Sequence, residues 1–107
     1  MELYVKEVPP YKQAPADRRE RENQRTRTAA LRKEVQNRFT TPMRQMGVRL
    51  TITYCRHKGR SDAVNIIGGI ADALNGIAYD DDKQITEIHY RETEGSIDEY
   101  HVIVEEV

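Results

Sequence analysis

The segment that decides the fold runs from Gly59 to Ile88 and reads GRSDAVNIIGGIADALNGIAYDDDKQITEI. Its first half predicts a helix from Asp62 to Asn75, because apolar side chains recur there at spacings of one, three and four residues. These apolar residues are Ile66, Ile67, Ile70, Ala71 and Leu74. Asn75 followed by Gly76 is a helix stop signal. Beyond an acidic run, residues Gln84 to Tyr90 predict a strand.

Two adjacent glycines, Gly68 and Gly69, stand in the middle of this predicted helix. Each costs about 1 kcal/mol relative to alanine in a helix interior. We therefore expect the helix to pack closely against another element or against a second subunit, so that the packing offsets the cost.

The residues before this segment predict a strand and a helix. Val48 to Arg56 alternates apolar and polar side chains, which is typical of a half-buried strand. Arg18 to Arg38 contains no glycine or proline, and Asp17 with Glu20 matches a capping box at its start. The helix is broken at Thr40-Thr41-Pro42.

Short strands are predicted near both ends of the chain, at Leu3–Val5 and at Tyr100–Val104, the latter after a turn at Thr93–Asp98. The order is therefore β-α-β-α-β-β, with the last two strands as a hairpin. We expect an α+β fold, a small mixed β-sheet with two helices on one face. The 107 residues are the length of one domain. We expect a single domain over residues 1–107, with residues 11–28 flexible when nothing is bound.

The net charge of -1 hides a strong asymmetry. Residues 1–60 carry 15 lysines and arginines against 6 acidic residues, whereas residues 61–107 carry 2 against 12. A basic half can neutralise phosphates by releasing counterions, and carboxylates can hold a divalent metal against a phosphate. The alternative is a solvated basic helix followed by an acidic tail.

Cysteine usage and hydropathy narrow the class of protein further. Cys55 is the only cysteine, so no intrachain disulfide can form, and no Cys/His cluster suggests a zinc site. This fits a reducing compartment. No apolar run is long enough to cross a bilayer. We therefore expect a soluble, cytoplasmic protein without a membrane partner.

Aspartates flank the predicted helix and are candidate metal ligands. Asp62 opens the helix after the basic run Arg56–Arg60, and Asp80–Asp82 follows it. Carboxylates that converge on Mg²⁺ would stabilise charge on a phosphate and activate water. Because about 14 helical residues rise about 21 Å, the acidic run must either return along the helix or meet Asp62 of a second subunit. The alternatives are a plain helix cap at Asp62 and a solvated turn at Asp80–Asp82.

Two stretches, GRSDAVN at 59–65 and DALNGIAYDDDKQI at 72–85, resemble the signature of the RusA family of Holliday junction resolvases. In that family an Asp-x-Asp-Asn motif opens a helix, which continues to Asp-Ala-Leu-Asn-Gly and closes with Asp-Asp-x-Gln-Val/Ile. The resemblance implies a Mg²⁺-dependent endodeoxyribonuclease, with Mn²⁺ as a possible substitute. It also implies a homodimer that binds branched DNA and places paired nicks in a four-way junction.

The resemblance also assigns roles to residues. It implies that Asp62 and Asp82 are catalytic metal ligands, that Asp81 assists them in both roles, and that Asn65 is the motif asparagine of the catalytic site. Phosphates of DNA are expected to be bound by the basic residues Arg56, Lys58, Arg60, Arg18, Arg19 and Arg25.

Two positions depart from the family pattern. Val64 stands where the motif has its second aspartate, and Gly68 stands where the family often has a lysine. Asp80 or Asp81 could replace the carboxylate, and the cationic residues Lys58, Arg60 or Lys83 could replace the lysine. Alternatively, the chain binds junctions without cutting them.

Overall fold

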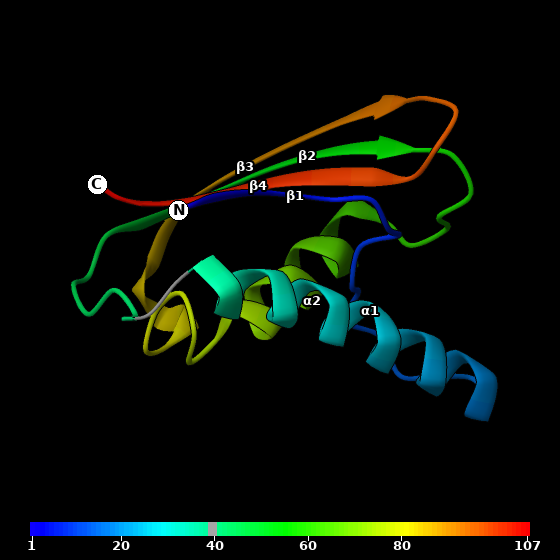
Figure 1. The fold of residues 1–107 in the computed structure, drawn as a ribbon, viewed down its shortest axis with the longest axis horizontal. Coiled ribbons are helices and arrows are strands. Elements are labelled where there is room, and N and C mark those ends of the chain that lie inside the picture. Colours follow the sequence, from blue (N-terminus) through cyan, green and yellow to red (C-terminus); the bar gives the residue numbers. More distant parts are fainter. Residues whose placement is uncertain (39–40) are drawn as a thin grey trace.

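The computed structural model describes residues 1–38 and 41–107 (Figure 1). In chain order, its elements are β1 (Glu2–Val5), α1 (Arg18–Arg38), β2 (Val48–Arg56), α2 (Ala63–Leu74), the 3-10 turn η1 (Asp82–Gln84), β3 (Ile85–Glu94) and β4 (Glu99–Glu106). The predicted order β-α-β-α-β-β and the α+β class are confirmed. Thr40, at which a helix break was expected, lies outside the described residues.

The four strands form one mixed sheet in the order β1-β4-β2-β3. β2 and β3 are parallel and are connected through α2, whereas β4 is antiparallel to both β1 and β2. The predicted hairpin between the last two strands is wrong, because β2 lies between β3 and β4. The turn at Gly95 instead reaches across the end of β2, where the Gly95 amide donates to the Arg56 carbonyl at 3.0 Å.

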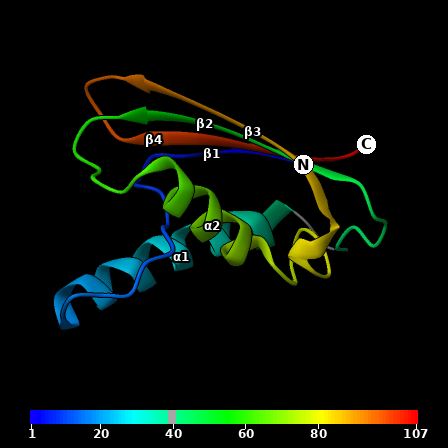
Figure 2. The same ribbon diagram turned by 180° about the vertical axis from the view of Figure 1, so that it is seen from behind.

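Both helices pack on one face of the sheet, and the opposite face is left open by the described residues (Figures 1 and 2). The alternating apolar side chains of β2 form the centre of the core, and Leu31 and Val35 of α1 cover it. α2 contributes its apolar stripe to the same core, so both predicted helix periodicities are confirmed. The fully buried members include Leu50, Ile52, Tyr54, Ile70 and Leu74.

Gly68 and Gly69 contact the chain segment that follows β1. A Cβ at Gly69 would overlap the backbone of Pro10 and Tyr11, and a Cβ at Gly68 would lie 3.2 Å from the Cβ of Lys12. The Lys12 amide also donates to the Asn65 carbonyl at 2.8 Å. The close packing expected at the two glycines is therefore present within the chain, and it joins the N-terminal segment to α2.

α1 packs on the sheet with its second half only. Its buried residues are Leu31 and Val35, whereas the arginine-rich first half extends beyond the edge of the domain (Figure 1). Among the described residues, no helix has the length and hydropathy needed to cross a membrane.

Candidate active site

Asp62 is the N-cap of α2. Its backbone is extended, and its side chain accepts a hydrogen bond from the Asn65 amide at 2.8 Å, while its carbonyl accepts from Ile66 at 3.0 Å. The cap leaves the carboxylate exposed at the start of a 12-residue helix. A helix N-terminus favours negative charge through its amides and dipole, and the Asp62 carboxylate occupies part of this position.

Hydrogen bonds to Asp98 fix the basic loop that precedes Asp62. The Asp98 carboxylate accepts hydrogen bonds from three consecutive amides, at 3.0 Å from His57, 2.8 Å from Lys58 and 3.1 Å from Gly59. It also accepts the hydroxyl of Tyr54. Burial raises the pKa of Asp98, but these hydrogen bonds lower it more, so the pKa lies well below its usual value.

Arg56 fixes the other side of the same loop. Its guanidinium donates to the Gly59 and Ser61 carbonyls at 2.7 Å each, and it forms a two-point ion pair with Glu92. It also lies 5.0 Å from the centre of the Tyr54 ring. Arg56 therefore shapes the loop through contacts within the chain, which use four of its five N–H donors.

A groove of about 750 Å³ runs between this loop and the first half of α1. Four of its lining residues are cationic: Arg19, Arg27, Lys58 and Arg60. Arg27 lies over the ring of Tyr11, at 5.1 Å from the ring centre, so one wall combines a cation with an aromatic face. Ser61, directly before Asp62, is among the lining residues, so the groove adjoins the N-terminus of α2.

The predicted DNA-binding residues are thus distributed over different surfaces. Arg19, Lys58 and Arg60 share the groove. Arg25 lines a separate hollow on another side of α1, and Arg18 is exposed at the start of that helix. Arg27, another arginine of the first half of α1, also lines the groove, and its contact with Tyr11 depends on how the segment after β1 folds back.

The second acidic group is organised by Gln84. Asp81 caps η1 by accepting from the Lys83 amide at 2.9 Å, and the Gln84 side chain accepts from the Asp81 amide at 2.9 Å. Gln84 is only 6% exposed, and it donates to the Met43 and Gln45 carbonyls. The Lys83 amide lowers the pKa of Asp81. Asp82 is partly exposed beside it.

The two acidic groups lie at opposite ends of α2 (Figures 1 and 2). Of the two alternatives, the chain does not take the return along the helix: after Gly76, Tyr79 pairs with Asn75, and its hydroxyl donates to the Ala71 carbonyl at 2.6 Å. This keeps the acidic run at the C-terminal end. The 12 residues of α2, which lie between the two acidic groups, rise about 18 Å.

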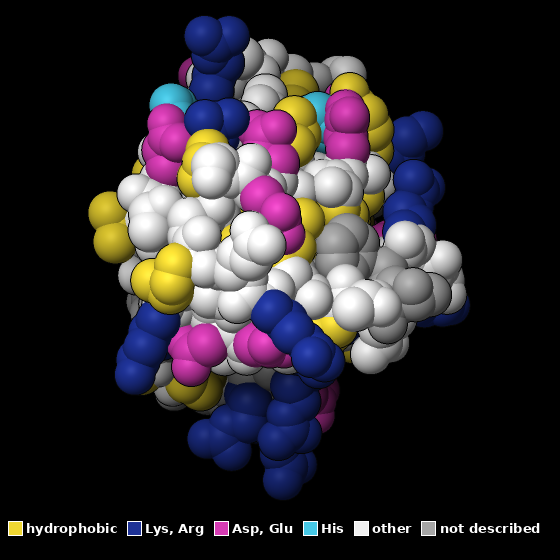
Figure 3. Space-filling view, turned by 90° about the vertical axis from the view of Figure 1, so that its left-hand side faces the viewer, with side chains coloured by type: hydrophobic (Ala, Val, Ile, Leu, Met, Phe, Trp, Pro, Cys, Tyr) yellow, Lys and Arg dark blue, Asp and Glu magenta, His cyan; other side chains and the backbone are white. Residues whose placement is uncertain are grey.

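This placement bears on metal binding. Among the described residues of one chain, no three histidine, cysteine, aspartate or glutamate side chains are grouped closely enough to hold a metal ion. At the end of the molecule that carries Asp80–Asp82, acidic and basic side chains are interspersed (Figure 3). Within the described part of one chain, Asp62 and the acidic run therefore do not form a common three-ligand site.

The two departures from the family motif are structurally distinct. Val64 is 77% exposed on the first turn of α2, so a side chain there points into solvent. Gly68, in contrast, is covered by the side chain of Lys12, whose ammonium forms an ion pair with Asp72 at 3.3 Å. A cation is therefore present over Gly68, although it comes from a residue that the sequence pattern did not single out.

A comparison with known protein families provides the identification. A family model described as endodeoxyribonuclease RusA matches residues 6–105. The class of protein is therefore an endodeoxyribonuclease, a hydrolase of phosphodiester bonds. The match spans nearly the whole chain, and the chain belongs to the RusA family of Holliday junction resolvases. No curated protein matches the chain.

Family membership confirms the resemblance seen in the sequence and has two consequences. RusA nucleases are metal-dependent, and their substrate is Holliday junction DNA. The basic groove and the exposed cap of α2 are consistent with such a substrate. The separation of the acidic groups raises the question of how a metal centre is assembled.

Proposed function

We propose that two copies of this chain act together on a four-way junction, and that each active site combines Asp62 of one subunit with Asp81 and Asp82 of the other. The placement of these residues at opposite ends of α2 carries the proposal, because a metal-dependent nuclease needs them to converge. A two-fold dimer contains two such sites, which suits the symmetric paired nicks of junction resolution.

In this proposal Asp62 and Asp82 hold Mg²⁺, with Mn²⁺ as a substitute, and Asp81 assists. Bound metal supplies charge stabilisation at the phosphate and an activated water. The chain contributes the remaining elements. Asn65 supports the Asp62 cap through its amide, and Gln84 orients the second acidic group from beneath.

The groove beside α1 is proposed to bind one arm of the junction. Arg19, Lys58 and Arg60 contact phosphates from two walls, while Arg18 and Arg25 on the outer faces of α1 reach a neighbouring arm. Arg56 acts by holding the loop that presents Lys58 and Arg60. Phosphate contacts of this kind fix the position of DNA without reading its sequence.

We also propose that the chain works as one domain over residues 1–107, with residues 11–28 changing conformation when DNA binds. The exposed first half of α1 supports this, because its own packing contributes little to its stability.

The decisive experiment mixes two inactive variants, Asp62→Asn and Asp82→Asn. Each homodimer should fail to cut a synthetic four-way junction in Mg²⁺ or Mn²⁺. A heterodimer has one intact composite site, so the mixture should regain nicking of a single strand per binding event. If the mixture stays inactive while wild type cuts, each site is built within one subunit and the composite arrangement is wrong.

A second candidate function is junction binding without cleavage. The observation that favours it is Val64, which places an exposed apolar side chain where the family motif has a metal ligand. Wild-type protein that binds a four-way junction tightly, cuts it in no divalent metal, and gains cutting in the Val64→Asp variant would select this alternative.

A further inference from the structure

β3 has one free edge. It lies at the end of the sheet and pairs with β2 alone among the described residues. At 10 residues it is far longer than β1, the 4-residue strand at the other edge. A long unpaired edge presents a row of amide and carbonyl groups that can pair with another strand.

The side chains of β3 suggest that this edge is covered in the working protein. Ile88 lies opposite Leu50 of β2 on the helix-covered face, yet it is 48% exposed whereas Leu50 is fully buried. The helices therefore cover β2 fully but leave Ile88 of β3 half exposed. Tyr90, two residues further on, is partly buried on the same face and packs against the core. An apolar side chain is thus left open beside the free edge, next to a partly buried aromatic ring.

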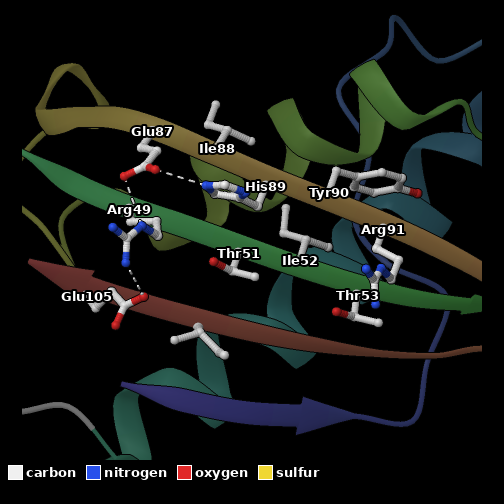
Figure 4. Close-up of a pocket in the computed structure, with 11 residues that line it drawn as sticks. Arg49, Thr51, Ile52, Thr53, Glu87, Ile88, His89, Tyr90, Arg91 and Glu105 are labelled. Atoms are coloured by element: carbon white, nitrogen blue, oxygen red, sulfur yellow. Dashed lines mark hydrogen bonds and ion pairs between the residues drawn. The ribbon is translucent and has the colours of Figure 1, made fainter. Parts of the chain in front are cut away.

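The opposite face of β3 carries charge. Glu87, His89 and Arg91 lie there beside Arg49, above a shallow groove of about 870 Å³ (Figure 4). Glu87 is paired with Arg49 at 2.9 Å and with His89 at 3.0 Å. Arg91 is exposed and has no ion-pair partner among the residues that the structure describes. The strand therefore carries a negative charge two residues before His89 and a positive charge two residues after it.

We propose that β3 pairs antiparallel with β3 of a second copy, around a two-fold axis at His89. In this register Glu87 faces Arg91 of the partner subunit, and Arg91 faces Glu87 of the partner subunit. Ile88 faces Tyr90 of the partner subunit on the helix side, and this contact also occurs twice. Opposite charges and aromatic–aliphatic pairs directly across an antiparallel ladder are both favourable.

The neighbouring registers are less complementary. An axis at Tyr90 would place Ile88 opposite Glu92 and bring His89 opposite Arg91. An axis at Ile88 would pair Glu87 with His89 and Ile88 with its own copy, but it would leave Arg91 opposite Ile85, beyond the β-bulge between residues 85 and 87. Registers with the axis between two residues would put the helices of the two copies on opposite faces, because side chains alternate along a strand. The axis at His89 pairs Glu87 with Arg91 on one face and Ile88 with Tyr90 on the other.

This interface rests on the proposed function and explains how its composite site forms. With the axis at His89, the start of β3, directly after Asp82–Gln84, lies beside the end of β3 of the partner subunit, which leads into the turn before Asp98. Asp98 is the residue that holds the loop leading to Asp62. Both copies of α2 lie on the same face of the extended sheet and run antiparallel. The pairing therefore brings the acidic run of one subunit toward Asp62 of the other.

Disulfide trapping tests the register directly. In a Cys55→Ser background, His89→Cys places two cysteines opposite one another, about 4.5–5.5 Å apart between Cα atoms, which suits a disulfide. Mild oxidation should convert most of the protein to a covalent dimer. The matched control, Thr93→Cys on the same face, lies about 26 Å from its symmetry mate and should stay uncrosslinked. Equal crosslinking of both variants, or of neither, overturns the proposal.

Sedimentation equilibrium provides a second readout that requires no activity. Wild type should be a dimer, Arg91→Glu should raise the dimer dissociation constant at least tenfold, and Arg91→Lys should leave it nearly unchanged. A dimer that is insensitive to Arg91→Glu overturns the interface. If that dimer still cuts junctions, the proposed function stands without it. A His89→Cys dimer that forms as expected, from a wild type that cuts in no metal, overturns the cleavage function instead.

Discussion

Gly69 of α2 lies against the backbone of Tyr11, so closely that a Cβ at residue 69 would overlap the Tyr11 amide nitrogen. The contact fixes the segment after β1 across the helix, together with the hydrogen bond from Lys12 to Asn65. Tyr11 also lines the basic groove, as does Ser61. One glycine therefore contributes to the core and to the shape of the candidate DNA-binding surface.

We expect Gly69→Ala to destabilise the fold. Overpacking a close contact costs about 1–3 kcal/mol, which outweighs the gain of about 1 kcal/mol in helix propensity. Gly68→Ala is the matched control, because the neighbouring atoms belong to the flexible Lys12 side chain, and its effect should stay within about 1 kcal/mol. Urea denaturation measures both. A Gly69→Ala variant as stable as wild type would show that the segment after β1 can move away.

We expect Asp98→Ala to weaken junction binding indirectly, through the loop that Asp98 fixes. Its loss leaves three loop amides without their acceptor, at a cost of about 2–3 kcal/mol in unfolding free energy. The loop that carries Lys58 and Arg60 then loses its fixed shape. Asp98→Asn keeps an acceptor oxygen and should retain most of the affinity. Fluorescence anisotropy with a labelled junction checks this, and equal affinity of the alanine variant would exclude a positioning role.

The depressed pKa of Asp98 predicts a dependence of stability on pH. A carboxyl group whose folded pKa is lowered contributes stability that is complete above its unfolded pKa, about 3.9 for aspartate. That contribution is lost as the pH falls toward the folded pKa. Between about pH 4 and pH 2, the unfolding free energy of wild type should therefore fall more steeply than that of Asp98→Asn. Parallel curves would mean that the hydrogen bonds do not persist in solution.

Lys58→Ala and Arg60→Ala should reduce affinity for junction DNA and its dependence on salt. Each lost phosphate contact lowers the slope of log K against log salt concentration by about 0.9. Lys33→Ala removes an exposed cation from α1 outside the groove and serves as the control. A slope that changes equally in all three variants would place the phosphate chain elsewhere.

The two halves of α1 should differ in hydrogen exchange. Residues 18–28 have few buried contacts, whereas the second half is held by Leu31 and Val35. We expect exchange in 18–28 to be at least tenfold faster without DNA, and slowed when a four-way junction binds. Uniform protection along the helix in the free protein would contradict the proposed change in residues 11–28.

Sequence patterns were sufficient to predict both α-helices and the four strands, because amphipathic patterns report which face of each element is buried. They did not predict the 3-10 turn at Asp82–Gln84, and β3 continues to Glu94, through residues that were expected to form a turn. They also did not predict the neighbour of each strand. The turn signal at Gly95 indicates that the chain reverses, but it does not show that β2 lies between the two strands. That outcome depends on the β2-α2-β3 crossover, which pairs β3 with β2 in parallel.

Some residues of the candidate site could also be predicted from the sequence, whereas others could not. Asp62 and Asp81 could be found because their capping roles depend on residues two or three positions away. Lys12 and Asp98 could not, because each acts on a segment about 40 or more positions away in the chain. Gln84 belongs to the motif, but its bonds to the Met43 and Gln45 carbonyls are equally distant. Such contacts arise only from the tertiary fold, and local spacing contains no signal for them.

The length of α2 has a consequence for how chains of this kind can vary. One residue added within the helix would shift everything after it by about 1.5 Å and turn it by about 100°. The acidic run would then rotate away from the direction in which it now points, and the pairing of Ile85 with Val48 would break. The length of α2 thus sets the distance and the relative rotation between Asp62 and the acidic run. Insertions and deletions should be tolerated between Gln13 and Ala16, beyond the segment that packs on α2, and be excluded between Asp62 and Ile85.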